Sequence, residues 1–126
     1  MSVNIQIQGI ANTQRFLSSK NKEALQLANE AIKKAGFFIE VELVASITGE
    51  RAEHRSVDTG NFRRSILAIF PKPMTANIGC NKYPVAYVNF LEYGTSTFTG
   101  RKHFMNTKTR NEKKVKDFVD AEIKKI

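Results

Sequence analysis

Apolar and polar residues alternate with two different periods along the first part of this chain. Strict alternation over residues 3–9 predicts a half-buried strand that ends at Gly9. We expect a first helix to begin after Asn12 or Thr13 and to break before Asn21, which offers a second cap. From there to about Ile47 the apolar residues recur at three- and four-residue spacing, which predicts one long helix.

The long helix carries two apolar stripes. The second stripe, Phe37, Val41 and Val44, lies on a side where the first half of the helix is polar. A domain of this size can hardly bury a helix on all sides, so we expect this stripe to be a subunit interface, with burial inside the chain as the alternative. The first stripe is broad and suited to packing on a sheet; it comprises Ala24, Ala28, Ala31, Ile32, Ala35, Phe38, Ile39 and Leu43.

The sequence Val57-Asp-Thr-Gly-Asn-Phe-Arg-Arg-Ser-Ile66 marks the point where helical periodicity gives way to strands. Asp58 and Thr59 are residue types that cap helices, and Gly60 relieves the steric limits of a tight turn. One or two helical turns should follow over residues 61–65. The pattern predicts a capped corner.

Two arginines in this corner, Arg63 and Arg64, point away from the side shared by Phe62 and Ile66. We expect them to be solvated. A structural role is the alternative, because Glu42 falls within the first stripe and a buried carboxylate needs a partner.

Two strands should follow the corner and form an antiparallel hairpin. Residues 66–70 are a continuous apolar run, Pro71-Lys72-Pro73 turns the chain, and residues 74–80 continue it. Between the long helix and the corner, residues 48–56 are polar and contain a glycine. We expect them to form an exposed, mobile loop.

Residues 81–93 favour a short helix, with a strand as the competing interpretation. Pro84 suits the first turn of this helix, and Gly94 suits the position just past its end. Glu92 should be either a surface residue or the acceptor for an arginine. The apolar face expected for this helix comprises Tyr83, Ala86, Tyr87, Phe90 and Leu91.

The last part of the chain combines a polar loop with a final helix. Phe98 stands alone in the loop of residues 95–101, where it either awaits a partner or folds back onto the core. From Phe104 onward a helix is expected, with one apolar face and Lys113, Lys114, Lys116 and Arg110 on or beside the opposite face. The apolar face comprises Val115, Phe118, Val119, Ile123 and Ile126.

The 126 residues fit a single domain, 1–126, with a formal net charge of +8. The positive excess lies in the second half, since residues 101–126 hold nine basic and four acidic side chains. Such a surface suits nucleic acid, anionic lipid or an acidic protein. Cys80 is the only cysteine, which excludes an internal disulfide. No apolar run is long enough to span a membrane, and no signal sequence is recognised, so we expect a cytoplasmic protein.

No catalytic motif is recognised. His54 and His103 do not form a ligand-spaced pair, and no phosphate-binding loop, nucleophile elbow or paired-carboxylate motif occurs. Asp58 and Glu92 could meet in space as a metal site, yet capping and ion pairing explain them better. We therefore expect no enzyme, no metal and no cofactor.

Two motifs, read in order, resemble a known family. They are the stretch from Val57 to Ile66 and the later stretch Tyr83-Pro-Val-Ala-Tyr-Val-Asn-Phe-Leu-Glu-Tyr-Gly-Thr95. Together they resemble the small neck, or head-to-tail joining, proteins (tail components) of long-tailed bacteriophages and related proviruses. The resemblance extends to a long N-terminal helix and to Arg101-Lys-His-Phe-Met105. The family usually has proline where His103 stands.

The resemblance implies an α+β fold, with a long N-terminal helix on a small antiparallel sheet, a short helix and a C-terminal helix. It implies a non-enzymatic virion protein of the head–tail region that is made and assembled in the host cytoplasm. The expected partners are copies of the chain in a ring and connector, head-completion or tail proteins. The framework residues would be Asp58, Thr59, Gly60, Arg63, Arg64, Glu92, Gly94 and Thr95, and the contact residues Phe37, Val41, Val44 and Phe98.

A basic nucleic-acid-binding module is the alternative function. Seven cations near the C-terminus could neutralise phosphates, although they lack interleaved aromatic residues and belong to no recognised reading motif. The two functions are compatible, because DNA passes through the neck in this family. The candidate contacts are Arg101, Lys102, Lys108, Arg110, Lys113, Lys114 and Lys116.

Overall fold

The computed structural model describes residues 3–8, 22–53, 55–56 and 60–125. The helix expected after Asn12 or Thr13 and the cap at Asn21 lie outside these residues. So do the proposed capping residues Asp58 and Thr59 and the histidine at position 54.

The described residues form an α+β fold, as the sequence predicts. A long helix, a three-stranded antiparallel sheet, a short helix and a C-terminal helix are all present. In chain order the elements are β1 (Asn4–Gln8), α2 (Lys22–Ile47), α3 (Asn61–Ser65), β2 (Leu67–Ile69), β3 (Thr75–Gly79), α4 (Val88–Tyr93) and α5 (His103–Lys124).

The sheet has the order β1-β3-β2, with both pairings antiparallel. Leu67 lies opposite Gly79, which confirms the predicted hairpin, and the first strand joins the other edge of β3 with Asn4 opposite the same glycine. Because side chains alternate across a strand, one sheet face carries buried Ala76 and Ile78.

The first stripe of α2 packs on that face. Seven of its eight residues are buried and Phe38 is half-buried, so the predicted packing on the sheet is confirmed in part; Ala35 and Phe38 face α5 instead. Ile32 and Leu43 are almost completely enclosed, at 1% and 0% exposure. Gly36 lets the helix come close to the sheet, because a Cβ there would lie 3.2 Å from that of Ala76.

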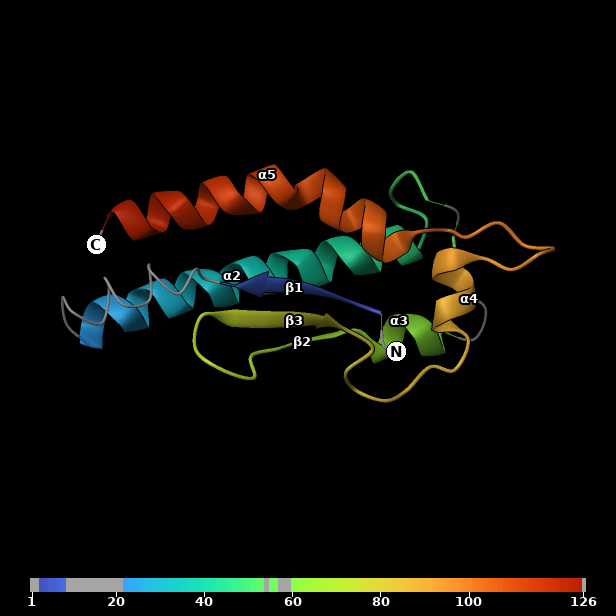
Figure 1. Cartoon of the computed structure of the whole chain (residues 1–126), viewed down its shortest axis with the longest axis horizontal. Coiled ribbons are helices and arrows are strands. Elements are labelled where there is room, and N and C mark those ends of the chain that lie inside the picture. The colour runs from blue at the N-terminus through green and yellow to red at the C-terminus, as the bar shows by residue number, and fades with distance from the viewer. Residues whose placement is uncertain (1–2, 9–21, 54, 57–59, 126) are drawn as a thin grey trace.

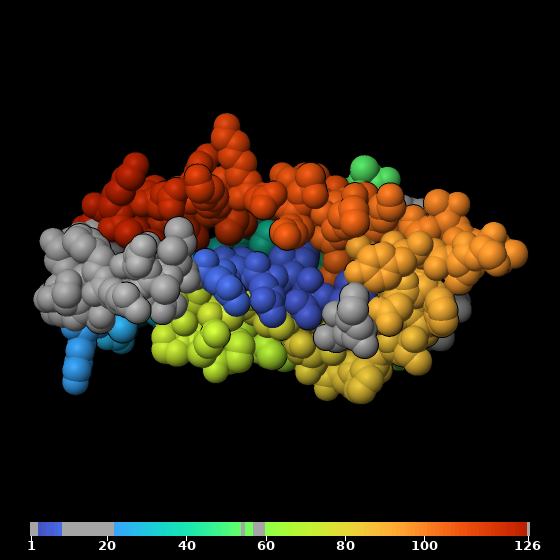
Figure 2. Space-filling model, viewed as in Figure 1, coloured from blue at the N-terminus to red at the C-terminus, as the bar shows by residue number. Residues whose placement is uncertain are grey.

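Helix α5 runs alongside α2, and together with the sheet they give an elongated molecule (Figure 1). Helices α3 and α4 and the loop of residues 95–100 gather at one end, while the C-terminal end of α5 lies at the other. The space-filling view shows the same division, with α5 along one side and the segments around α4 at one end (Figure 2). None of the described helices has the length and apolarity needed to cross a membrane.

The short helix differs from the prediction in its start and in its buried face. It begins at Val88, so Pro84 precedes it and is not in its first turn; Gly94 does follow its end. Val85 and Val88 are buried, whereas Tyr87 and Phe90 are exposed at 42% and 58%. Branched aliphatic side chains fill the core here, and the amphipathic tyrosines remain outside.

Candidate interaction site

The corner after the long loop is a compact turn anchored by one aromatic ring. Gly60 has a φ of +83°, in the left-handed region that favours glycine, and α3 follows directly. Phe62 is buried at 2% exposure and packs against the rings of Tyr87 and Phe104, at centroid distances of 6.5 and 6.2 Å. The predicted apolar anchor at Phe62 is confirmed and joins α3 to α4 and α5, whereas the predicted caps Asp58 and Thr59 lie outside the described residues.

The arginines of the corner lie on its outside. Arg63 and Arg64 are exposed, and Nη2 of Arg64 donates to Oδ1 of Asn61 at 3.2 Å. The Tyr83 hydroxyl donates to the backbone oxygen of Asn61 at 2.8 Å. These contacts hold Arg64 and Tyr83 beside Asn61.

Glu92 has a role that the sequence does not reveal. It is buried at 2% exposure, and its two carboxylate oxygens accept hydrogen bonds from the backbone N–H groups of Phe104 and Met105, both at 2.9 Å. These groups belong to the first turn of α5, where N–H groups have no partner within the helix. Glu92 therefore caps α5 from α4, and both expectations for it, a surface residue or the acceptor for an arginine, are wrong.

Two glycines bring the chain back to the position where Glu92 can cap α5. Gly94 has a φ of +83°, and a Cβ there would lie 2.5 Å from the backbone nitrogen of Gly100. A Cβ on Gly100 would in turn lie 2.5 Å from the Glu92 backbone oxygen. The hydrogen bond from Thr95 N–H to the Phe98 oxygen, at 2.8 Å, closes the turn between them. The Glu-Tyr-Gly-Thr motif is therefore a framework that fixes the start of α5.

Glu42 pairs with a residue in the following loop and not with the corner. Its Oε2 accepts a hydrogen bond from Nε of Arg51 at 2.7 Å, and Arg51 is 36% exposed. The predicted pairing with Arg63 or Arg64 is wrong, because Arg51 is only nine residues away and reaches back along the helix. A pair this exposed contributes at most about 1 kcal/mol.

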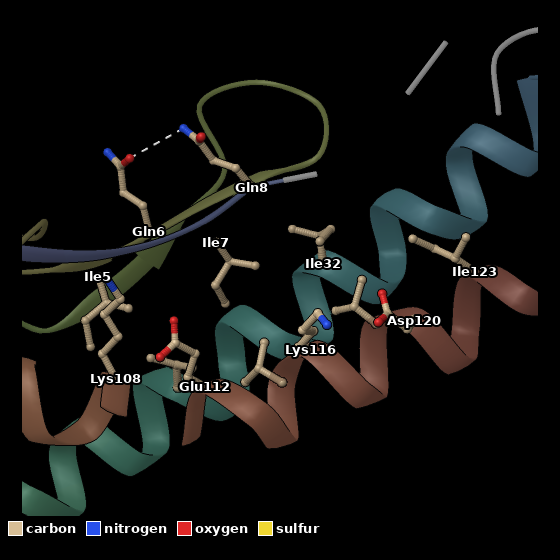
Figure 3. Close-up of a pocket in the computed structure, with 13 residues that line it drawn as sticks. Ile5, Gln6, Ile7, Gln8, Ile32, Lys108, Glu112, Lys116, Asp120 and Ile123 are labelled. Atoms are coloured by element: carbon tan, nitrogen blue, oxygen red, sulfur yellow. Dashed lines mark hydrogen bonds between the residues drawn. The ribbon is translucent and has the colours of Figure 1, made fainter. Parts of the chain in front are cut away.

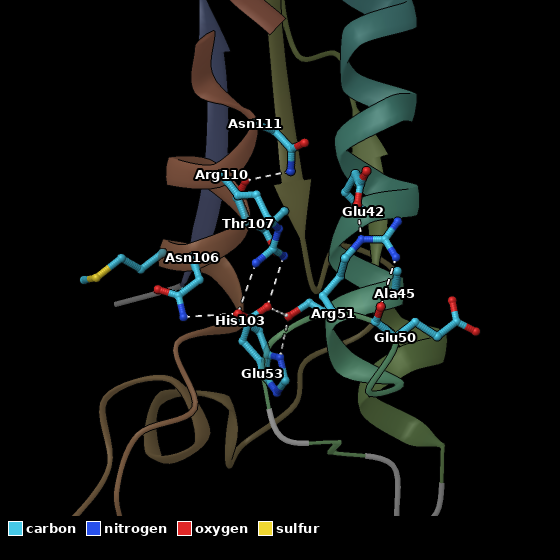
Figure 4. A network of polar contacts seen from close by, with 12 residues as sticks. Glu42, Ala45, Glu50, Arg51, Glu53, His103, Asn106, Thr107, Arg110 and Asn111 are labelled. Atoms are coloured by element: carbon cyan, nitrogen blue, oxygen red, sulfur yellow. Dashed lines mark hydrogen bonds and ion pairs between the residues drawn. The ribbon is translucent and has the colours of Figure 1, made fainter. Parts of the chain in front are cut away.

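The loop between α2 and α3 is held by a largely buried group of side chains that we call the polar clasp: Ser46, Glu53, Ser56, His103 and Arg110. Figure 4 shows three of them, Glu53, His103 and Arg110, converging from the loop and α5. The Ser46 hydroxyl donates to Glu53 at 2.6 Å and contacts Nδ1 of His103 at 2.8 Å. Nε2 of the same ring contacts the Ser56 hydroxyl at 2.7 Å. Because Ser46 gives its only proton to Glu53, Nδ1 of His103 carries a proton and donates it to the Ser46 oxygen.

Glu53 is the charged centre of the clasp. Arg110 donates to both its oxygens, at 3.0 and 3.1 Å, and Asn106 adds a bond at 3.2 Å. Burial raises the pKa of the Glu53 carboxyl, but the hydrogen bonds from Arg110, Ser46 and Asn106 outweigh it, so the pKa lies below the ordinary value of 4.5. The expectation of an exposed loop is therefore wrong for Glu53.

The clasp contains a serine that is hydrogen-bonded to a histidine, and this histidine connects separate parts of the fold. His103 is fully enclosed at 0% exposure and packs against Phe62 at a centroid distance of 6.0 Å. Both ring nitrogens are occupied by serine hydroxyls. The histidine therefore connects α5 to the end of α2 and to the loop.

The second stripe of α2 is only partly covered by the described chain, where the ring of Phe70 contacts that of Phe37 at a centroid distance of 5.3 Å. Phe37 is 52% exposed, Val41 is 65% exposed and Val44 is half-buried. Leu27, at 49%, continues the line toward the start of the helix. We call Leu27, Phe37 and Val41 the α2 ridge. Burial of this stripe inside the chain, the alternative interpretation, is excluded for Phe37 and Val41.

A second group of exposed apolar side chains lies at the α3–α4 end of the molecule, and three of its four members belong to the apolar face expected for the short helix. Tyr83, Tyr87, Phe90 and Tyr93 are exposed at 38%, 42%, 58% and 58%. We call these four residues the aromatic end. Their three-residue spacing over 87–93 is the one sequence signal that could have indicated a shared outer face.

Phe98 is partly withdrawn from solvent by its own loop. It is half-buried, and the guanidinium carbon of Arg101 lies 5.1 Å from its ring centroid. Arg101 also donates to the Ser56 hydroxyl at 2.7 Å. The contact surface expected at Phe98 is therefore partly occupied from within the chain.

Several of the seven candidate nucleic-acid contacts are engaged inside the protein. Arg110 belongs to the polar clasp, Arg101 is bonded to the loop, and Nζ of Lys114 lies 5.0 Å from the centroid of the Phe38 ring. Lys113, Lys114 and Arg110 were expected on the polar side of α5, yet two of these three contact other elements. The remaining candidates are Lys102, Lys108, Lys113 and Lys116, all exposed.

A groove of about 350 Å³ separates β1 from α5 (Figure 3). Its floor includes Ile5, Ile7 and Ile32, and long charged side chains such as Lys116 and Asp120 line its rim. No buried polar group of the described residues converges on it, so it lacks the fixed donors and acceptors of a specific small-molecule site.

No cluster of three or more metal-ligating side chains occurs among the described residues. Asp58, one half of the hypothetical metal pair, lies outside them, and the other half, Glu92, is committed to the cap of α5. Comparison with known proteins gives no match to a family model, to a curated protein or to a solved structure.

Proposed function

We propose that this protein is a non-enzymatic virion structural protein of the head–tail joining region, which assembles with copies of itself or with connector and tail proteins. The proposal combines the resemblance of the two motifs with one observation from the structure. That observation is the α2 ridge, where Phe37 and Val41 are more than half exposed on a helix whose other side is buried.

Exposed side chains of this kind favour association. Complete burial of a phenylalanine or valine side chain is worth roughly 1.5–3 kcal/mol, and rows of such residues on one helix face are unusual on a monomer surface. The motif residues support the same function indirectly. Glu92 and the two glycines fix α5 and α4 relative to each other, which gives a rigid body suited to repeated contacts.

The alternative function, a basic nucleic-acid-binding module, has less support from the contacts of its cations. Three of its seven cations, Arg101, Arg110 and Lys114, contact other groups of the chain. The four remaining lysines share α5 and its approach with Glu112, Asp117 and Asp120, which reduces the local positive potential.

Light scattering after size-exclusion chromatography, over a concentration series, tests the proposal. The expected result is a mass above 14.2 kDa that grows with concentration, or a complex with a purified connector or tail protein. A protein that stays monomeric at its highest soluble concentration, and that joins none of these proteins, contradicts the proposed function.

A further inference from the structure

The groove between β1 and α5 runs along one edge of the sheet. The strand order β1-β3-β2 makes β1 and β2 the two edge strands. Backbone N–H and C=O groups on such an edge have no partner in the sheet, and they can pair with another chain unless something covers them. The two edges of this sheet differ in this respect.

The edge of β2 is covered by a side chain of α2. The backbone N–H of Ala68 donates to Oε2 of Glu40 at 3.1 Å. In an antiparallel pair the N–H and C=O groups of one residue point to the same side, and this side alternates along the strand. Ala68 therefore points away from β3. Ile78, which lies opposite Ala68, points its own backbone groups away from β2 and toward β1.

The same alternation assigns the backbone groups of β1. Ile5 lies opposite Ile78 and Ile7 lies opposite Ala76, so Ile5 and Ile7 form the hydrogen-bonded pairs with β3. Gln6, between them, points its N–H and C=O groups away from the sheet. Among the described residues, the hydrogen bond of Gln6 outside the sheet is one that its side chain accepts from Gln8 at 3.4 Å. The described chain therefore leaves the backbone edge at Gln6 uncovered.

The two long helices extend beyond this uncovered edge. Helices α2 and α5 lie side by side, and α5 borders the groove next to β1 (Figure 1). Two helices packed in this way span about 20 Å, whereas three strands at their usual spacing span about 14 Å. The helix pair is thus wider than the sheet by roughly one strand, and the excess lies beyond β1.

The groove offers an apolar surface to a strand in this position. Val115, Val119 and Ile123 of α5 line it and are half-buried, as is Ile7 of β1. Figure 3 shows the side chain of Ile7 on the side of β1 that faces α5. A strand added beside β1 would place every second side chain on this apolar surface and the others toward solvent.

The charges along the groove do not favour a charged segment. Exposed basic and acidic residues alternate at four-residue spacing along α5, and two of each sign give no net charge. These four residues are Lys108, Glu112, Lys116 and Asp120. Selection in the groove should therefore depend on the order of apolar side chains and on backbone hydrogen bonds.

The position of α5 distinguishes an isolated segment from the sheet edge of a second copy. Pairing two β1 edges about a two-fold axis would place α5 of one copy in the layer that α2 and α5 of the other already fill. An extended segment brings no helix of its own into that layer. The geometry therefore favours a single strand from a partner protein.

We propose that an extended segment of a partner protein, with apolar side chains at alternate positions, binds in the groove as a fourth strand paired with β1. Backbone hydrogen bonds to Gln6 would supply affinity, and the apolar lining would select the alternate side chains, as in other cases of strand addition. This inference goes beyond the proposed function, since it requires no second copy and uses no residue of the α2 ridge.

A titration of the ¹⁵N-labelled full chain, followed by NMR spectroscopy, tests the proposal. The probe is the peptide Lys-Thr-Val-Thr-Val-Thr-Val-Lys. The signals of Gln6, Val115 and Val119 should shift and saturate, and amide hydrogen exchange at Gln6 should slow. The control peptide, Lys-Val-Val-Val-Thr-Thr-Thr-Lys, has the same composition without the alternation and should bind about tenfold more weakly or less.

Two variants of the protein test the two parts of the site separately. Gln6→Pro removes the outward N–H, and proline is tolerated on an edge strand where the N–H faces away from the sheet. It should weaken binding by about tenfold, whereas Gln6→Thr, the matched control, keeps the N–H and should bind as the wild type does. Val119→Glu leaves β1 unchanged and places a carboxylate in the apolar lining, so it should also weaken binding.

Several results would overturn the inference. One is the absence of shifts at Gln6 and Val119 at millimolar concentrations of the alternating peptide. Equal binding of the two peptides would show that alternation is not selected. A folded Gln6→Pro or Val119→Glu protein, with the circular dichroism spectrum of the wild type and undiminished binding, would have the same consequence.

Discussion

Replacing Glu53 with glutamine should remove most of the stabilisation that the polar clasp provides. The Glu53 side chain is 2% exposed and accepts hydrogen bonds from Ser46, Asn106 and both terminal nitrogens of Arg110. Glutamine keeps the shape but loses the charge, and its amide group turns a donor toward other donors. Arg110 is then left without its counter-ion.

The expected loss of unfolding free energy in Glu53→Gln follows from the burial of Glu53 and Arg110. Breaking a buried ion pair by removing one member costs about 3–5 kcal/mol. Arg110 is 32% exposed and can be partly hydrated once it is unpaired, so the lower limit applies, about 3 kcal/mol. For a domain of this size the melting temperature should fall by roughly 10 °C.

Chemical denaturation and thermal melting measure this effect, with Glu50→Gln as the control. Glu50 is an exposed glutamate of the same loop, so its substitution should change the unfolding free energy by less than about 0.5 kcal/mol. A Glu53→Gln protein that is as stable as this control refutes the assignment of Glu53 as the charged centre of the clasp.

The same residue makes stability depend on pH. Because the pKa of Glu53 is lower in the folded protein than its ordinary value of 4.5, the unfolded state binds the proton first as pH falls. The stabilisation is complete above that ordinary value and is lost as pH falls through the folded pKa. The difference in unfolding free energy between wild type and Glu53→Gln should therefore shrink on acidification. A difference that grows instead would contradict a lowered pKa of Glu53 in the folded protein.

Three further outcomes follow from the described contacts. Glu92→Gln should destabilise the protein by about 1–2 kcal/mol in chemical denaturation, because it weakens the cap of α5; an unchanged midpoint contradicts this role. Arg51→Met should change the unfolding free energy by less than about 1 kcal/mol, since its pair with Glu42 is partly exposed; a larger loss would falsify the view that this pair is peripheral. Burial, only partly offset by a hydrogen bond with Ser65, raises the pKa of the Cys80 thiol, so alkylation of the folded protein should require a higher pH than alkylation of the unfolded chain.

The elements that the sequence predicts correctly are those with a regular apolar period. Alternation over residues 3–9 predicts β1, and the first stripe predicts α2 and the side that faces the sheet. The hairpin follows from two apolar runs around Pro71-Lys72-Pro73. In each of these elements one face is buried, so the spacing of the apolar residues follows from the period of the strand or helix itself.

The errors occur where a partner is distant in sequence or where a side chain is amphipathic. Glu92 bonds to backbone groups twelve and thirteen residues away, and no residue type marks a backbone N–H as the partner. The ring of His103 contacts Ser46, 57 residues earlier in the sequence, and Ser56, 47 residues earlier. Tyr87 counts as apolar in a periodicity analysis, yet a tyrosine can keep its hydroxyl end in water.

The second stripe of α2 is the prediction most relevant to function, and its exposure is confirmed for Phe37 and Val41 but not for half-buried Val44. Phe37, Val41 and Val44 were identified because they extend the apolar surface of a helix that already has a buried face. The sequence does not reveal the aromatic end, because three of its rings, Tyr83, Tyr87 and Phe90, are expected on the apolar face of the short helix. Only the three-dimensional structure shows that these rings are exposed while Val85 and Val88 are buried.

The mass of the wild-type chain beside that of Val41→Glu, by light scattering at the highest soluble concentration, tests most directly whether this protein functions by docking through the ridge. We predict that the wild type exceeds 14.2 kDa and that Val41→Glu does not. Equal masses for the wild type and Val41→Glu would contradict the account.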